Sequence, residues 1–395
     1  MIFNISLAEF KDSLKKTLPA ISSKTTIPIL EHLNFILEGN ILKIISTDQD
    51  ITIMTTVEVD GIEDGSVLIP GKRLNDVISS FNNNLELKFE VNQENYEIKY
   101  KYSTGNYTMK GLNPQDYLEL PELFQSNKPN FDGENIIKEI GADIDAAFFE
   151  KEQLQRLAIK TGNSVSTDEF RPAMTGVLIQ FRNNIVKAVS TDSYRLSMAT
   201  LKTEKNNFPE ELDLIIPSKT IGLIKLFDSD VLVSFIKSNS KITHIRFDVD
   251  NTIYISRIID EKFPPYESVI PTNNELVALV DKTELLSSIK SVSQCSNRLS
   301  KQIKIKFESN TMVISGKDDD SGTDAILTKP CEYSNPESFE MGFNYTFLEQ
   351  SINNLDNLEN NIIYFTFSDP QSSALLLPSL NDSDVLMLIM PVRIS

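Results

Sequence analysis

The chain has 395 residues, of which 40% are hydrophobic, and a formal net charge of −18 at pH 7. This length suits two or three domains, and the hydrophobic content is enough for packed cores, which excludes wholesale disorder. The acidic charge argues against a simple nucleic-acid binder, although an acidic exterior around a locally basic face would give the same total.

We predict no membrane-spanning or targeting segment. Glu9 and Asp12 interrupt the N-terminal stretch, where a signal peptide requires an unbroken apolar core. The longest apolar run, VLMLIM at 385–390, is far shorter than the roughly 18 residues of a membrane-spanning helix. Because the only cysteines are Cys295 and Cys331, we expect no disulfide framework and a cytoplasmic location.

Helical periodicity opens three similar stretches of the chain, which begin at Ser6, Glu150 and Asp281. Apolar residues one helical turn apart predict one buried stripe on each helix. The stripes comprise Phe10 and Leu14, Leu154 and Leu157, and Leu285 and Ile289.

Alternating strands follow these helices. In LELKFEV at 85–91 the apolar residues alternate with Glu and Lys, and YEIKYKY repeats the pattern after a polar turn at 92–95. This alternation predicts a hairpin with one solvated face. The same pattern returns at Ile303, Ile305 and Phe307, ahead of a turn at 309–310.

A second helix is predicted after each set of strands, opening near Pro70, Pro217 and Gly342. The repeat spacing of about 130 to 145 residues is too long for a solenoid unit. We therefore predict an α+β protein of three tandem helix-plus-antiparallel-sheet domains, at 1–126, 147–271 and 272–395.

Two copies of Ser-Thr-Asp lie between strands, at 46–48 and 190–192. Asp48 and Asp192 are expected to accept backbone hydrogen bonds in a turn rather than to carry chemistry.

No catalytic, cofactor or metal site is predicted. The two histidines, His32 and His244, lie in strand-like runs without a nucleophile in a recognisable context. Glycine-rich phosphate loops and zinc-ligand spacings are absent from the sequence. The acidic run that begins at Asp318 fails the calcium-loop pattern, because position twelve is Lys329 instead of Glu. We expect a solvated turn there.

Basic residues recur on equivalent helices. Lys11 and Lys15 lie one turn apart, as do Arg156 and Lys160, and Lys219 and Lys225 mark the second helix of copy two. Lys72 aligns with Lys219 and is followed by Arg73. Each pair alone could be an ordinary solvated helix face, but the recurrence favours a basic surface that contacts phosphates without reading bases.

Five motifs in order resemble one family over essentially the whole length. They are TIPIL at 26–30, STDSYRLS at 190–197, KFPPYESVIP at 262–271, GFNYTFLEQSI at 342–352 and IMPVRIS at 389–395. The chain resembles the bacterial DNA polymerase III beta subunit, the sliding clamp.

The resemblance implies a head-to-tail homodimeric ring with helices inside and sheets outside. Such a ring encircles duplex DNA and confers processivity on the replicative polymerase. Lys24 matches a DNA-contact position of the family, whereas Asp168, Pro172 and Ala173 depart from other such positions.

The resemblance also implies a hydrophobic cleft between the second and third domains for short peptides of polymerases, the clamp loader and repair proteins. Ser268 departs from the family's arginine beside the cleft. Without the resemblance, we would predict residues 390–394 to be a C-terminal strand whose end packs against the domain. The implied cleft residues are Arg171, Met174, Thr191, Tyr194, Arg195, Leu196, Pro264, Tyr266, Val269, Asn344, Phe347, Ser373, Met390, Pro391, Val392 and Arg393.

For the subunit interface, the resemblance implies contact between domain one of one chain and domain three of the other. Tyr107 and Met109 would face Gln294 and Cys295, and Gln294 occupies an often apolar position. Two alternatives remain open at this point: a cytosolic hydrolase with an unrecognised site, and a monomeric repeat protein that binds peptides but not DNA.

Overall fold

The computed structural model describes residues 1–22, 25–82, 86–103, 105–118, 130–131, 136–137, 146–203, 208–238, 241–333, 335–356, 359–380 and 384–394. They fall into two compact units. Unit 1 comprises Met1–Lys151 and Phe227–Ile258, and unit 2 comprises Glu152–Leu226 and Ile259–Ser395. None of the helices among the described residues is long and apolar enough to cross a membrane.

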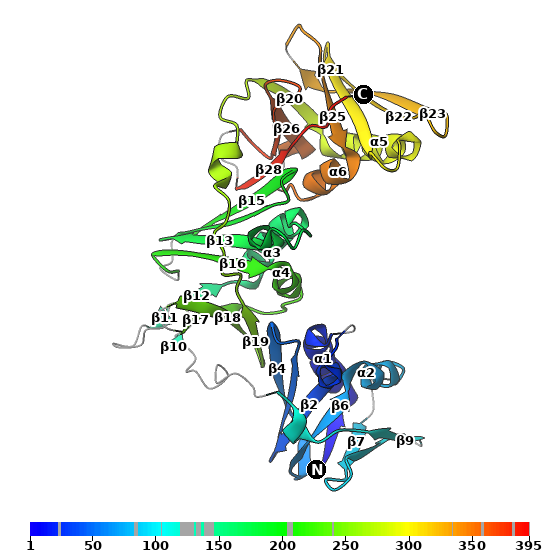
Figure 1. Ribbon diagram of the computed structural model, residues 1–395, viewed down its shortest axis with the longest axis vertical. Coiled ribbons are helices and arrows are strands. Elements are labelled where there is room, and N and C mark those ends of the chain that lie inside the picture. The colour runs from blue at the N-terminus through cyan, green and yellow to red at the C-terminus, as the bar shows by residue number, and fades with distance from the viewer. Residues whose placement is uncertain are drawn as a thin grey trace. The chain divides into compact units, whose positions relative to one another are not determined.

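Unit 1 contains two large antiparallel sheets, with strand orders β5-β1-β7-β8-β9 and β12-β17-β18-β19-β4-β3-β2-β6, and a two-stranded β10-β11 pair. Helices α1 (Leu7–Thr17) and α2 (Gly71–Ser79) contact each other, and α1 packs on β1, β3 and β4 (Figure 1). The strands are β1 (Ile2–Ser6), β2 (His32–Glu38), β3 (Ile41–Thr47), β4 (Ile51–Glu58), β5 (Asp60–Glu63), β6 (Gly65–Pro70), β7 (Glu86–Val91), β8 (Glu97–Tyr102), β9 (Gly105–Lys110), β10 (Asn130–Phe131), β11 (Ile136–Ile137), β12 (Ala146–Phe149), β17 (Val231–Ser238), β18 (Lys241–Val249) and β19 (Thr252–Arg257).

Unit 2 has a nine-stranded sheet, β16-β13-β14-β15-β28-β27-β26-β20-β24, and a four-stranded sheet, β23-β22-β21-β25. Its helices are α3 (Lys151–Thr161, whose first residue belongs to unit 1), α4 (Ser218–Ile224), α5 (Lys282–Val292) and α6 (Tyr345–Asn353). The strands are β13 (Gly176–Arg182), β14 (Ile185–Thr191), β15 (Arg195–Lys202), β16 (Glu211–Pro217), β20 (Leu276–Asp281), β21 (Gln302–Glu308), β22 (Thr311–Asp318), β23 (Thr323–Pro330), β24 (Glu332–Tyr333), β25 (Phe339–Asn344), β26 (Ile362–Phe367), β27 (Ala374–Leu377) and β28 (Val385–Ile389).

The predicted helices are present, and their apolar stripes are buried. The six stripe residues are between 0% and 5% exposed. The third helix of the first set, α5, begins at its predicted start because Asp281 caps it, its Oδ1 accepting from the Glu284 N–H at 2.8 Å. The last predicted helix, α6, begins later than expected, because Gly342 still belongs to β25 and Asn344 is the N-cap.

The predicted hairpins and turns are also confirmed. Strands β7 and β8 pair across the turn at 92–95, and β21 and β22 pair across the turn at 309–310. Ser309 and Asn310 both have positive φ, of 46° and 60°, a conformation that suits a tight hairpin. The acidic segment after Asp318 is a turn between β22 and β23, in which Gly322 takes φ 66°.

Aromatic side chains fill the centre of unit 1. Phe10 from α1 meets Phe35 and Phe89 edge-on at centroid distances of 6.0 and 5.6 Å, and Phe89 also stacks on Phe3 at 5.2 Å. All four rings are 0% exposed. Edge-to-face and stacked ring pairs each contribute beyond the area that they bury, so this cluster fixes α1 against the sheets.

Two strand pairings cross the predicted domain boundaries. Strand β4, from the first predicted domain, pairs with β19 from the second, with Tyr254 opposite Ile53. Strand β15, from the second, pairs with β28 from the third, with Ser197 opposite Met387. Each large sheet therefore continues from one repeat into the next, and this continuity places parts of the second repeat in both units.

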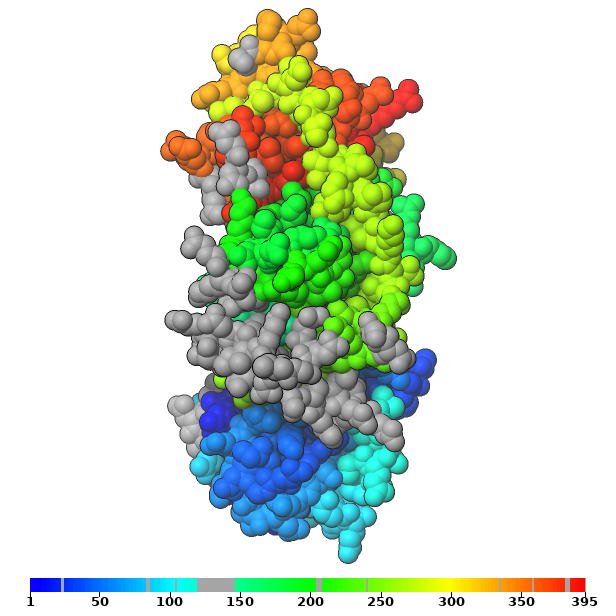
Figure 2. Space-filling model, turned by 90° about the vertical axis from the view of Figure 1, so that its left-hand side faces the viewer, coloured from blue at the N-terminus to red at the C-terminus, as the bar shows by residue number. Residues whose placement is uncertain are grey.

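The segment 259–275 runs over the surface of unit 2 after leaving unit 1 (yellow-green in Figure 2). Its Phe263 and Tyr266 pack with Leu178 and Leu196 of the nine-stranded sheet. The Tyr266 hydroxyl donates to Gln180 Oε1 at 2.7 Å. Burial first, and the nearby Glu267 charge second, raise the pKa of Tyr266, so it stays a neutral donor.

Candidate functional site

The aspartates of both Ser-Thr-Asp segments lie in turns that follow strands β3 and β14, as predicted. Asp192 Oδ1 accepts from the backbone N–H groups of Tyr194 and Arg195, both at 3.0 Å. In unit 1, Asp48 Oδ1 accepts in the same way from Asp50 and Ile51, at 3.1 and 2.7 Å. The aspartates fold the chain back between two strands, and in unit 2 this turn places Tyr194 directly before β15 and Arg195 at its first residue.

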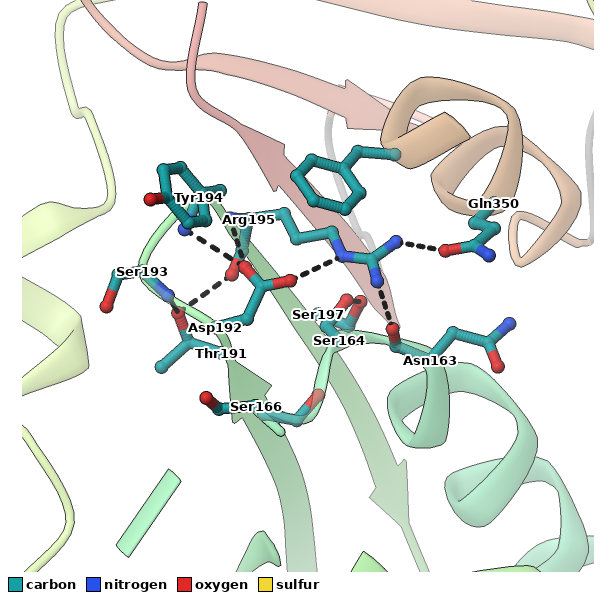
Figure 3. Close-up of polar contacts among 12 residues, drawn as sticks. Asn163, Ser164, Ser166, Thr191, Asp192, Ser193, Tyr194, Arg195, Ser197 and Gln350 are labelled. Atoms are coloured by element: carbon teal, nitrogen blue, oxygen red, sulfur yellow. Dashed lines mark hydrogen bonds and ion pairs between the residues drawn. The ribbon is translucent and has the colours of Figure 1, made fainter. Parts of the chain in front are cut away.

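Arg195 is the most heavily engaged side chain of the predicted cleft (Figure 3). It is 7% exposed, and its Nε donates to Asp192 Oδ2 at 3.0 Å. Nη1 donates to Gln350 Oε1 and Nη2 to the Asn163 carbonyl, each at 2.5 Å. A buried guanidinium is stable only when its N–H groups are paired, and here three partners from separate segments pair it.

An aromatic wall lies against this guanidinium. The Arg195 Cζ atom is 4.4 Å from the centre of the Phe347 ring, within the range of a cation–π contact. Tyr194 stacks on the same ring, with centroids 6.1 Å apart and an interplanar angle of 27°. Tyr194 is 62% exposed, so the wall presents an aromatic surface to solvent.

The C-terminal tail borders the same region. Strand β28 ends at Ile389, and the N–H of the exposed Met390 then donates to the Tyr194 carbonyl at 2.8 Å. Beyond it the Val392 N–H donates to Gly342 O at 2.9 Å. The tail thus continues past the strand as an anchored segment. A hollow of ≈ 630 Å³ lies beside it, lined by Pro370, Gln371, Pro391, Val392, Arg393 and Ile394.

The predicted cleft residues divide by exposure. The buried set forms the floor, and its apolar members Leu196 and Tyr266 share one cluster with Leu388. The buried members are Met174, Arg195, Leu196, Tyr266 and Ser373. The exposed or half-buried members are Arg171, Thr191, Tyr194, Pro264, Val269, Asn344, Phe347, Met390, Pro391, Val392 and Arg393.

A short loop holds Arg171 at the edge of this surface. Asp168 Oδ1 accepts from the Phe170 N–H at 3.0 Å, and Arg171 Nη1 donates to Ser193 Oγ at 2.8 Å. The neighbouring Phe170 side chain is 98% exposed. The loop therefore adds a fully accessible aromatic ring to the border of the Tyr194 turn.

The predicted DNA-facing cations differ in their surroundings. Lys72 and Arg73 on α2 are exposed, and so is Lys219 on α4. Lys225 is half-buried, and burial lowers its pKa. Lys24 lies outside the described residues.

Arg156 and Lys160 have an internal partner. The Asp356 carboxylate accepts from Arg156 Nε and Nη2 at 3.2 and 3.3 Å, and Lys160 Nζ lies 2.9 Å from it. Burial alone would raise the pKa of Asp356, but the hydrogen bonds from Arg156 and Lys160 outweigh it and hold that pKa below its usual value. Nearby, Lys282 Nζ donates to the Leu355 carbonyl at 2.8 Å. Much of the charge of Arg156 and Lys160 is thus neutralised within unit 2.

The predicted interface residues lie beside open sheet edges. Tyr107 and Met109 belong to β9, the edge of the five-stranded sheet. Gln294 and Cys295 form a short turn after α5 that contacts β23, the edge of the four-stranded sheet. Ile326 on β23 is 67% exposed. An apolar edge strand invites pairing with another strand.

Three family models match the chain in order. They describe the N-terminal, central and C-terminal domains of the DNA polymerase III beta subunit, and match residues 1–121, 149–265 and 267–393. The chain belongs to the DNA polymerase III beta subunit family. The beta sliding clamp of Staphylococcus epidermidis is 26% identical over 407 residues, covering 100% of this chain and 99% of that relative. That of Staphylococcus aureus has the same identity and coverage.

Solved sliding clamps share the fold over their full length. The Pseudomonas aeruginosa clamp has a TM-score of 0.84 at 21% identity, and the Bacillus subtilis clamp 0.84 at 22%. A Bartonella birtlesii clamp bound to griselimycin has 0.85 at 22%. Each comparison covers 100% of both chains.

The chain is thus a DNA sliding clamp, a processivity factor of DNA replication without catalytic activity of its own. This assignment confirms the function predicted from the motifs and disfavours both the hydrolase and the peptide-binding monomer. The two histidines differ in their surroundings. Burial, with the Arg257 charge, lowers the pKa of His244, and His32 Nδ1 contacts Pro28 O at 3.1 Å.

Sequence reasoning missed three groups around this clamp's aromatic wall: Gln350, the Asn163 carbonyl and Phe170. Gln350 lies three residues after Phe347, one turn along α6, and this spacing places the two side chains on one face. The spacing is visible in the sequence, but its partner Arg195 lies 155 residues away in the chain, and local patterns do not reveal such a pair.

Proposed function

We propose that two copies of the chain close head to tail into a ring around duplex DNA, and that each copy presents one cleft to short peptides of polymerases and the clamp loader. The observation that carries the ring is the pair of open edges, β9 and β23, beside the predicted interface residues. Pairing β9 of one copy with β23 of the other satisfies the open backbone groups of both edges and buries Ile326. The contact is made twice, once at each junction between the two copies, and this closes the ring.

We divide the clamp into domains at 1–126, 147–271 and 272–395. The three family-model matches, at 1–121, 149–265 and 267–393, support this division. The continuous sheets then act as the joints between neighbouring domains, since β4 pairs with β19 and β15 with β28.

The DNA face is assigned to the predicted cations, with Lys72 and Arg73 foremost because they are exposed on one helix. Lys24, Lys219 and Lys225 complete the set, while Arg156 and Lys160 contribute less because of Asp356. Such a face attracts phosphates without reading sequence, and the net charge of −18 keeps the rest of the surface repulsive to DNA. We place this activity in the cytoplasm, with the chromosome.

The peptide cleft is assigned to the surface around Tyr194, Phe347 and Met390. These side chains offer accessible apolar area above the buried floor that contains Leu196 and Tyr266. An apolar peptide anchor that covers them gains about 25 cal/mol for each Å² of apolar surface removed from water. The griselimycin complex of a related clamp supports a ligand site on this fold.

The ring is tested by retention on DNA. Clamps loaded by the cognate loader should remain on a nicked circular plasmid and leave it after a restriction enzyme linearises it. Sedimentation should give about twice the 44.6 kDa chain mass. Equal loss from circular and linear plasmid contradicts topological linkage, and a monomeric mass at micromolar concentration contradicts the dimer.

The DNA face is tested by Lys72→Glu with Arg73→Glu. The pair should shorten residence on the circular plasmid and flatten its salt dependence, because each phosphate contact adds about one counterion to the slope. A matched control is Lys99→Glu, which reverses an exposed lysine of β8 outside the predicted face. If Lys99→Glu shortened residence on the plasmid as much as the Lys72→Glu and Arg73→Glu pair, the assignment of the DNA face would be refuted.

A further inference from the structure

Gln350 holds a central position in the cleft without belonging to any predicted contact set. Its side-chain oxygen accepts from Arg195 Nη1 at 2.5 Å. The other polar partners of the guanidinium, Asp192 and Asn163, come from the β14–β15 turn and the segment after α3. Gln350 alone among these three partners comes from α6, the helix that also carries Phe347 (Figure 3).

We propose that Gln350 is a positioning residue of the peptide cleft: by accepting from Arg195, it holds the guanidinium over Phe347 and so fixes the aromatic wall that receives the peptide. The inference rests on the proposed cleft function. It assigns Arg195 to the support of the wall, because only 7% of Arg195 is exposed and three of its five N–H groups already have partners within the fold.

The physical reason lies in the cost of an unpaired buried donor. Without an acceptor at residue 350, Nη1 loses its partner inside a nearly closed site. The free-energy penalty of such an unpaired buried donor exceeds the net stabilisation that the hydrogen bond provides. The guanidinium can recover a partner only by turning toward water, which removes it from the Phe347 face at 4.4 Å. Phe347 and the stacked Tyr194 then gain freedom that a peptide must remove on binding.

The glutamine also sets the charge of the wall. Among the described residues, Asp192 supplies the carboxylate paired with Arg195, at 3.0 Å, and Gln350 supplies a neutral oxygen. The cluster of Arg195, Asp192 and Gln350 is therefore neutral overall. A carboxylate at position 350 would keep the acceptor and add one negative charge.

The test uses the full-length clamp and a short fluorescein-labelled peptide from the clamp-binding segment of the replicative polymerase, titrated by fluorescence anisotropy. Gln350→Met keeps the side-chain length and removes the acceptor. It should weaken binding at least about tenfold, which corresponds to the lower limit for a lost hydrogen bond to a charged group. Gln350→Glu restores an acceptor and should bind within about twofold of the unmodified clamp. Asn353→Ala, on the exposed side of the same helix, is the matched control and should leave binding unchanged.

A spectroscopic readout separates positioning from general damage. The Arg195 Nε–H resonance should be protected from solvent exchange in the unmodified and Gln350→Glu clamps, and should exchange faster in Gln350→Met, with thermal midpoint and dimer mass retained. Peptide binding by Gln350→Met equal to that of the unmodified clamp, while removal of 390–395 abolishes it, would overturn the inference and leave the cleft intact. Weakening by Gln350→Glu equal to that by Gln350→Met would also overturn it. No binding by any form, the unmodified clamp included, would overturn the cleft assignment and the inference together.

Discussion

Replacement of Asp356 by Asn tests whether the cations of α3 serve the structure of unit 2. The carboxylate lies 2.9 Å from Lys160 Nζ and 3.2 Å from Arg156 Nε. The side chains of Lys160, Arg156 and Asp356 are 9%, 25% and 32% exposed. The amide of Asn keeps the shape of the side chain but leaves two cations without their counter-charge.

The magnitude follows from this graded exposure. A fully exposed ion pair contributes about 0 to 1 kcal/mol, and removal of one partner from a buried pair costs about 3 to 5 kcal/mol. Lys160 is nearly buried, whereas about a third of Asp356 meets solvent, so solvent screening reduces the larger figure. We expect Asp356→Asn to lower the free energy of unfolding of unit 2 by about 1 to 3 kcal/mol.

The assay is urea unfolding at pH 7 and again near pH 3. The folded-state pKa of Asp356 is depressed, so its stabilisation is complete above the unfolded pKa of about 3.9 and is lost as the pH falls through the folded value. The difference between the two proteins should therefore shrink in acid. Asp213→Asn is the control, because its pair with Arg182 is 46% and 43% exposed and should cost less than about 1 kcal/mol. Equal losses for both substitutions, or a loss independent of pH, would refute the reasoning.

Three further predictions address the tail, the interface and a thiol. Deletion of Met390–Ser395 should abolish polymerase-peptide binding and leave the dimer intact; unchanged affinity in anisotropy would refute the site. Ile326→Glu on the β23 edge should raise the dimer dissociation constant, measured by sedimentation, at least about tenfold and should leave the unfolding of the monomer unchanged. The control is Ile62→Glu, also on an exposed edge strand, which should change neither the dissociation constant nor the unfolding of the monomer. Burial raises the pKa of Cys331 to about 11, so its alkylation at pH 8.5 should be about two orders of magnitude slower than in the urea-unfolded chain, and equal rates would contradict its burial.

Local patterns were sufficient for the repeated helices and for the β7–β8 and β21–β22 hairpins. The stripe that contains Phe10 and Leu14 predicted α1, and the alternation at 85–91 predicted β7. Apolar residues three to four positions apart share one face only in a helix, and apolar residues two positions apart share one face only in a strand. The Asp192 turn followed from the chemistry of a short side chain that bonds to its own backbone. The motifs in register then identified the family.

The sequence by itself determined the threefold repeat, the type of the repeated helices and hairpins, and the family of the chain, since all three depend on spacing along the chain. Only the tertiary structure decided how individual charges are used. Lys72 and Lys160 were both predicted to face DNA, yet one is exposed and the other lies against Asp356, 196 positions further along the chain. The same holds for Arg195, which Gln350 draws into the support of the aromatic wall. The partner of a charge is set by which distant segments pack together, and that information is not contained in any local pattern.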